Sequence, residues 1–117
     1  MDVPNALIRE LSLDFKAQFG RSPSLLVFAP GRINIIGEHI DYNDGYVCPA
    51  AIDKFMGFAI GPANGDLSLI TALDLNEEFQ FDANDTFHPE ESHWTNYFKG
   101  VLSQFSTEYI APFQLCF

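Results

Sequence analysis

The chain is poor in basic residues and in long apolar runs, and each shortage excludes a class of protein. It has 6 Lys and Arg against 16 Asp and Glu, which gives a formal net charge of −10. Nucleic acids and anionic membranes are bound by basic faces, so neither is an expected partner. No stretch approaches the roughly 18 consecutive apolar residues of a membrane-spanning helix. The acidic residues are spread along the whole chain, as is typical of a solvated surface.

Cysteine is also scarce. Cys48 and Cys116 lie far apart, each in an apolar run. This pattern predicts two buried thiols in a reducing compartment, not a metal-binding pair or a disulfide framework. The polar start of the chain has neither the basic residues nor the apolar stretch of a signal peptide. We therefore expect a cytoplasmic protein.

Apolar and aromatic residues are abundant. Of the 117 residues 47% are hydrophobic, and 12 are phenylalanine. This composition excludes a disordered chain, and the length allows one domain at most. There is no internal repeat and no low-complexity segment.

The first part of the chain predicts a helix and then a strand. Leu7, Leu11, Phe15 and Phe19 recur every four residues, and Gly20 is a natural helix stop. The apolar run "SLLVFAP" predicts a short buried strand that ends at Pro30 and Gly31. Further on, Asn43-Asp44-Gly45 is typical of a tight turn.

The second part predicts strands, a helix and a strand. Two stretches, Leu67 to Asp74 and around Phe79 and Phe81, alternate with period two, which is typical of sheet strands with one better-buried face. A helix with Ser92 as its N-cap is expected next. Its apolar stripe consists of Trp94, Tyr97, Phe98, Val101, Leu102 and Phe105.

The last element, "PFQLCF", predicts another alternating strand. We expect one edge of this strand to be unpaired, because residues 1–117 lack the elements that would cover it. The order helix, strands, helix, strand predicts an α+β fold. The abrupt end suggests a truncated chain.

Charged side chains and a histidine that could bind a ligand lie close together in "GRINIIGEHIDYNDGY", Gly31 to Tyr46. The carboxylates of Glu38 and Asp41 are pure acceptors, suited with His39 to the vicinal hydroxyls of a neutral sugar. The guanidinium of Arg32 is permanently charged and forked, and it suits phosphate oxygens or a carboxylate. Together these groups suggest a site where a polyhydroxyl substrate meets a phosphoryl group.

Two other interpretations of this motif remain open. Glu38, His39 and Asp41 are close enough in sequence to ligate a divalent metal, although alternation along a strand would place Glu38 and His39 on opposite faces. Alternatively, an ion pair between Arg32 and its acidic neighbours does no more than steady a turn.

The stretch "APGRINIIGEHIDYNDGYVCPAAID", residues 29–53, closely resembles the signature of galactokinases, which are GHMP-type small-molecule kinases. The early helix and the segment "HWTNYFKGV" resemble family members as well. The resemblance implies that residues 1–117 are the N-terminal, galactose-binding part of a GHMP-kinase-like domain, with a mixed sheet and flanking helices.

The resemblance also implies roles for single residues. Arg32 corresponds to the arginine that stabilises the transferring phosphoryl group, and Glu38, His39 and Asp41 correspond to sugar ligands. Trp94 resembles a tryptophan of the adenine pocket, although it also fits the apolar stripe of a core helix. The residues expected to shape the edge of the sugar pocket are Ile40, Tyr42, Asn43, Asp44 and Gly45.

The implied activity is transfer of the γ-phosphoryl group of ATP to the anomeric hydroxyl of galactose, with Mg²⁺. The family's phosphate loop and catalytic base do not occur in residues 1–117, so we expect this stretch alone to be inactive and to hold no metal. Two alternatives are an N-acetylgalactosamine kinase and a non-catalytic galactose sensor. "DYNDGY" argues against the first, because relatives with that preference often carry a shorter turn.

Overall fold

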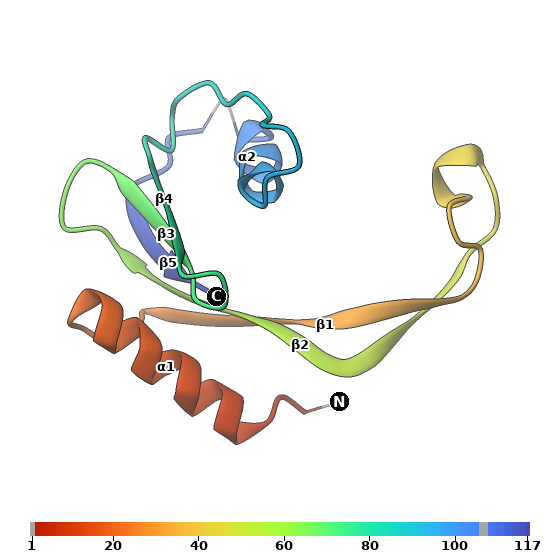
Figure 1. Ribbon diagram of the computed structural model, residues 1–117, viewed down its shortest axis with the longest axis horizontal. Coiled ribbons are helices and arrows are strands. Elements are labelled where there is room, and N and C mark those ends of the chain that lie inside the picture. Colours follow the sequence, from red (N-terminus) through yellow and green to blue (C-terminus); the bar gives the residue numbers. More distant parts are fainter. Residues whose placement is uncertain (1, 106–107) are drawn as a thin grey trace.

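The computed structural model describes residues 2–105 and 108–117 and contains a five-stranded sheet with a helix on each side (Figure 1). The elements are α1 (Asn5–Phe19), β1 (Leu25–Ile36), the 3₁₀ turn η1 (Asp41–Asn43), β2 (Cys48–Pro62), β3 (Ser68–Ala72), β4 (Glu77–Phe81), α2 (Thr95–Ser103) and β5 (Phe113–Cys116). The expected α+β class and mixed sheet are confirmed. Within the described residues, no helix has the length and apolar character needed to cross a membrane.

The sheet has the strand order β1-β2-β5-β3-β4. Its ladders are antiparallel except between β3 and β5, which run parallel. The expectation of an unpaired edge on β5 is wrong, because β5 is the central strand and bonds to β2 on one side and β3 on the other. The edges of the sheet are β1 and β4.

The helix α1 covers one face of the sheet, as its four-residue spacing predicted. Leu11 and Phe15 are buried against Ala59 of β2 and Cys116 of β5. The helix ends at Gly20, which adopts a left-handed conformation with φ 73°. Burial raises the pKa of the Cys116 thiol to about 11, and the charge of Asp14 adds to the effect.

The other face of the sheet packs against α2. Ile70 and Phe81 of the predicted strands are buried there with Leu115 of β5, and Phe98 of α2 packs on them. Ser68, Ile70 and Ala72 of β3 are buried on this face, and Thr71 is buried on the other. Figure 1 shows α1 and α2 on opposite sides of the sheet.

The start and the stripe of α2 differ from the prediction. Trp94, not Ser92, occupies the N-cap position, and the backbone N–H of Thr95 donates to Nδ1 of His93 instead of to a serine hydroxyl. Only part of the apolar stripe faces inward: Tyr97 and Val101 are 81% and 61% exposed. These two side chains line an open cavity.

A buried lysine ties α2 to the loop before it. The Lys99 ammonium donates to the Glu90 carboxylate and lies 5.2 Å from the centre of the Phe79 ring. The hydrogen bond from Lys99, together with its charge, lowers the pKa of Glu90. The apolar stem and the paired charge explain how a lysine can be buried on this face.

The hairpin of β1 and β2 extends well beyond the two helices. The prediction that the first strand ends at Pro30 is wrong, because β1 continues to Ile36. Proline is tolerated there since β1 is an edge strand, and a register shift between Pro30 and Arg32 accommodates the missing N–H. We call residues 31–51 the arm; in Figure 1 it projects away from the rest of the sheet.

The arm is apolar and exposed. Ile33, Ile35, Ile36 and Tyr46 are between 51% and 96% exposed. The prediction that Cys48 is buried is therefore wrong: its apolar run lies on the arm, where it is exposed. Cys116 is buried, and both cysteines are free thiols as expected.

Candidate functional site

The predicted sugar-site residues all lie in the part of the arm that joins β1 to β2. The chain leaves β1 at Gly37, whose φ is 98°. A Cβ at this position would lie 2.7 Å from the carbonyl oxygen of Tyr46, so the close approach of the two chain segments requires glycine. The 3₁₀ turn Asp41–Asn43 forms the tip.

The tight turn predicted at residues 43–45 is confirmed. The N–H groups of Asn43 and Gly45 donate to the carbonyl oxygen of Ile40, at 3.1 and 2.9 Å. Asp44 takes the left-handed conformation with φ 58°. Asparagine and aspartate tolerate that conformation better than most residues do, which explains why the turn forms at this position.

Local hydrogen bonds hold the polar side chains of the tip. Nδ1 of His39 and the hydroxyl of Tyr42 are bonded at 3.1 Å. The amide of Asn43 donates to the carbonyl oxygen of His39 at 3.4 Å. Glu38 accepts from Nδ2 of Asn34 at 3.2 Å, and its other oxygen lies 4.0 Å from Nε2 of His39. These contacts bring Glu38, His39, Tyr42 and Asn43 together.

Asp41 and Arg32 are differently placed. Asp41 is exposed in η1, and within the described residues its carboxylate has no hydrogen-bond partner. Arg32 is exposed on β1, opposite Ala51. The interpretation of Arg32 as a mere ion-pair partner is wrong, because none of the ion pairs among the described residues includes it.

The prediction that Glu38 and His39 lie on opposite faces of a strand is wrong. Glu38 and His39 lie in a turn, not in a strand, so strand alternation does not separate them. Among the described residues, no group of three or more His, Cys, Asp or Glu side chains is arranged to hold a metal ion.

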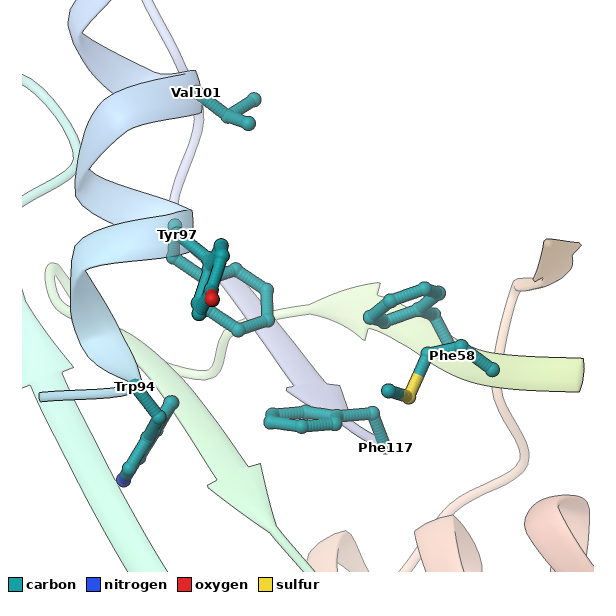
Figure 2. Close-up of a pocket in the computed structure, with 7 residues that line it drawn as sticks. Phe58, Trp94, Tyr97, Val101 and Phe117 are labelled. Carbon is teal, nitrogen blue, oxygen red and sulfur yellow. The ribbon is translucent and has the colours of Figure 1, made fainter. Parts of the chain in front are cut away.

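Trp94 lies far along the chain from the arm, at the start of α2. It borders an open cavity of about 470 Å³, which Figure 2 shows between α2, β2 and the end of β5. The lining is Met56, Phe58, Trp94, Tyr97, Phe98, Val101 and Phe117. The ring centre of Trp94 is 5.7 Å from that of Phe117, and the indole N–H of Trp94 donates to the Glu77 carboxylate at 2.5 Å.

The cavity explains how both interpretations of Trp94 can apply at once. Trp94 packs edge-on against Phe98 and Phe117 and also lines the cavity, whose apolar lining suits a flat apolar ring. Sequence reasoning missed Met56 and Phe58, which belong to β2, and Phe117, which follows β5. A more polar hollow shares Trp94 and Tyr97 with the cavity and adds Ser92, His93 and Asn96.

A family model of the galactokinase galactose-binding signature matches residues 13–62. This range runs from the middle of α1 to the end of β2 and includes the whole arm. Galactokinases from Actinobacillus pleuropneumoniae serotype 5b and Clostridium perfringens strain 13 are 42% and 41% identical to this chain, over 75% and 81% of its residues. The chain is related to the galactokinases.

Solved structures agree with this relationship. The galactokinase of Lactococcus lactis, determined in complex with galactose, superposes with a TM-score of 0.75 at 28% identity and covers 94% of this chain. The mevalonate kinase of Methanococcus jannaschii, with a TM-score of 0.61 at 19% identity over 79% of this chain, shares the fold. This chain covers 30% and 31% of those two structures. It spans about a quarter of the length of the curated galactokinases, 23% and 25%.

Proposed function

We propose that residues 1–117 are the N-terminal, galactose-binding part of a cytoplasmic galactokinase, which transfers the γ-phosphoryl group of ATP to the anomeric hydroxyl of galactose. The observation that carries this proposal is the match of residues 13–62 to the galactose-binding signature, which includes the entire arm. The polar tip of the arm is consistent with it, because carboxylates and an imidazole suit the hydroxyls of an uncharged sugar.

In this proposal the arm contacts the sugar. Glu38 and Asp41 accept hydrogen bonds from galactose hydroxyls, and His39 is oriented beside them by its bond to Tyr42. Residues 40 and 42–45 shape the edge of the pocket. Asp41 has an uncommitted carboxylate at the tip, so it is the residue whose loss should affect the sugar most directly.

Arg32 acts on the phosphoryl group instead of the sugar. It is exposed and has no ion-pair partner among the described residues, so its charge is available to an anionic ligand. Phosphoryl transfer depends mainly on positioning and on charge stabilisation, and a guanidinium supplies both.

The nucleotide contacts Trp94. The adenine ring stacks in the aromatic cavity, where Trp94 and Tyr97 offer two faces on the same side of α2. Mg²⁺ neutralises the charge of the transferring phosphates when it is bound. We propose that the main ligands of Mg²⁺ lie outside residues 1–117.

The test compares the chain alone with a fusion. Residues 1–117 are produced alone and also fused to the part of A. pleuropneumoniae galactokinase that follows the matched region, and galactose-dependent ADP release is measured. We expect turnover by the fusion and none by residues 1–117. Electrostatic stabilisation of the transition state requires the complete site, and residues 1–117 contain only part of it.

Other results would contradict the proposal. Preference of the fusion for N-acetylgalactosamine would favour the related kinase, and binding of galactose without turnover would favour a sensor. Turnover by residues 1–117 alone would place the chemistry in residues that we have not assigned.

A further inference from the structure

Asn34 lies on the arm between the two kinds of site residue. It pairs with Pro49 in the β1–β2 ladder, two residues after Arg32. The ladder is regular from Arg32 to Asn34, with register shifts only before and after this stretch. Since strand residues two apart share a face, Arg32 and Asn34 project from the same face of β1.

The turn at Gly37 brings Glu38 back over this position. Nδ2 of Asn34 donates to one oxygen of Glu38 at 3.2 Å. The other oxygen accepts no hydrogen bond from the described residues and lies 4.0 Å from Nε2 of His39. The side-chain amide of Asn34 makes no other hydrogen bond within residues 2–105 and 108–117.

This contact restrains a side chain that would otherwise be mobile. The side chain of Glu38 is 70% exposed, and an exposed glutamate samples many rotamers. A donor that fixes one oxygen removes much of this freedom before a ligand arrives and leaves the second oxygen to accept from a hydroxyl. We propose that Asn34 is a positioning residue that pre-orients Glu38 for the sugar; this rests on the proposed function.

The first measurement is the Asn34→Ala variant of the fusion. We expect the KM for galactose to rise about three- to tenfold with kcat within about twofold, because an exposed hydrogen bond to a charged group is weaker than a buried one. A change confined to KM is the sign of lost ground-state binding. Asn5→Ala, at the exposed start of α1, is the matched control and should leave both constants unchanged.

The second measurement exchanges donor and acceptor. Asn34→Asp removes the donor and places two carboxylates together, so its KM should exceed that of Asn34→Ala. In the double variant Asn34→Asp/Glu38→Gln the amide is on the other partner and the bond can form again. The fold increase in the KM of the double variant should therefore be at least about threefold smaller than the product of the fold increases for Asn34→Asp and Glu38→Gln alone. Such a departure is expected for residues in direct contact.

A structural role for Asn34 gives different results. The positioning role is wrong if the fold increases in KM for Asn34→Asp and Glu38→Gln simply multiply in the double variant. It is also wrong if Asn34→Ala lowers the free energy of unfolding while KM is unchanged. The unsubstituted fusion separates this inference from the proposed function. If it fails to turn over galactose, the proposed function fails, and the same variants are then compared by calorimetric galactose binding, where additive effects would still overturn the role of Asn34.

Discussion

The packed part of the sheet and the arm differ in what holds them. Around β5, side chains from α1, α2 and several strands bury one another in two clusters. On the arm, backbone ladder bonds and short local hydrogen bonds hold the chain, and the large apolar side chains are exposed. All the predicted sugar-site residues are on the arm. Stability and the proposed sugar binding are therefore carried by separate regions, and substitutions in each should change different measurements.

The largest effect should come from the packed region. Phe15 is fully buried, and Phe15→Ala should lower the free energy of unfolding of the chain by about 3–5 kcal/mol because it leaves a cavity. Ile35→Ala on the arm should change it by less than about 0.5 kcal/mol. Denaturant unfolding followed by circular dichroism measures both, and Phe15→Leu gives a milder step if Phe15→Ala does not fold. Equal losses at the two positions would contradict the distinction.

The next largest effect is expected on kcat, from a substitution on the arm. Arg32→Ala in the fusion should lower kcat about a hundredfold or more, since the loss of an arginine at the transferring phosphoryl group has large effects. The KM for galactose should change little, and the midpoint of unfolding should not change. Steady-state kinetics decides this. A raised KM with unchanged kcat would instead place Arg32 in the sugar pocket.

A smaller effect is expected at the tip. Asp41→Ala in the fusion should weaken galactose binding about ten- to a hundredfold, because a hydrogen bond to a charged acceptor is worth about 1.5–3 kcal/mol. Calorimetry measures the affinity. Asp66→Ala, in the exposed turn before β3, removes the same charge and serves as the control. Unchanged affinity in the Asp41 variant would remove this residue from the site.

The smallest effect concerns the thiol in the packed region. The folded chain keeps the Cys116 proton up to its pKa of about 11, whereas the unfolded chain releases it near the ordinary value of 9.0. The unfolded state therefore binds fewer protons between these values, and the free energy of unfolding should fall as pH rises from about 9 to about 11.

Cys116→Ala should remove that part of the pH dependence, as measured by denaturant unfolding at several pH values. Alkylation gives an independent check. Iodoacetamide should modify the exposed Cys48 in the folded chain and Cys116 only after unfolding. Equal reactivity of the two thiols would contradict the burial of Cys116.

The sequence predicted well what depends on local periodicity. The spacing of Leu11 and Phe15 predicted α1, and period-two alternation predicted β3 and β4, because one buried face leaves a regular signal. It predicted poorly what depends on neighbours. Pro30 does not end β1 because that strand is at the sheet edge, and Cys48 is exposed because its apolar run is on the arm.

The candidate site was predicted in a different way. The chemical character of residues 38–45 and the galactokinase resemblance selected the residues, and their roles stay predictions. Asn34 was missed because it lies among isoleucines and interrupts no pattern. The sequence shows only that a polar residue lies two positions after Arg32 and four before Glu38. The turn at Gly37 must be known before a contact between Asn34 and Glu38 can be inferred from that spacing.

The central position of β5 has a consequence for synthesis on the ribosome. In the sheet formed by the described residues, the β1–β2 and β3–β4 hairpins join only through β5, which comes last of the five strands. As the chain emerges, each hairpin can pair locally, but the sheet cannot close until residues 113–116 have left the exit tunnel. Until β5 is in place, the strand edges of β2 and β3 that pair with it have unpaired backbone N–H and C=O groups. A translational pause before residue 113 would prolong that aggregation-prone stage, whereas a pause after residue 116 has cleared the tunnel would not.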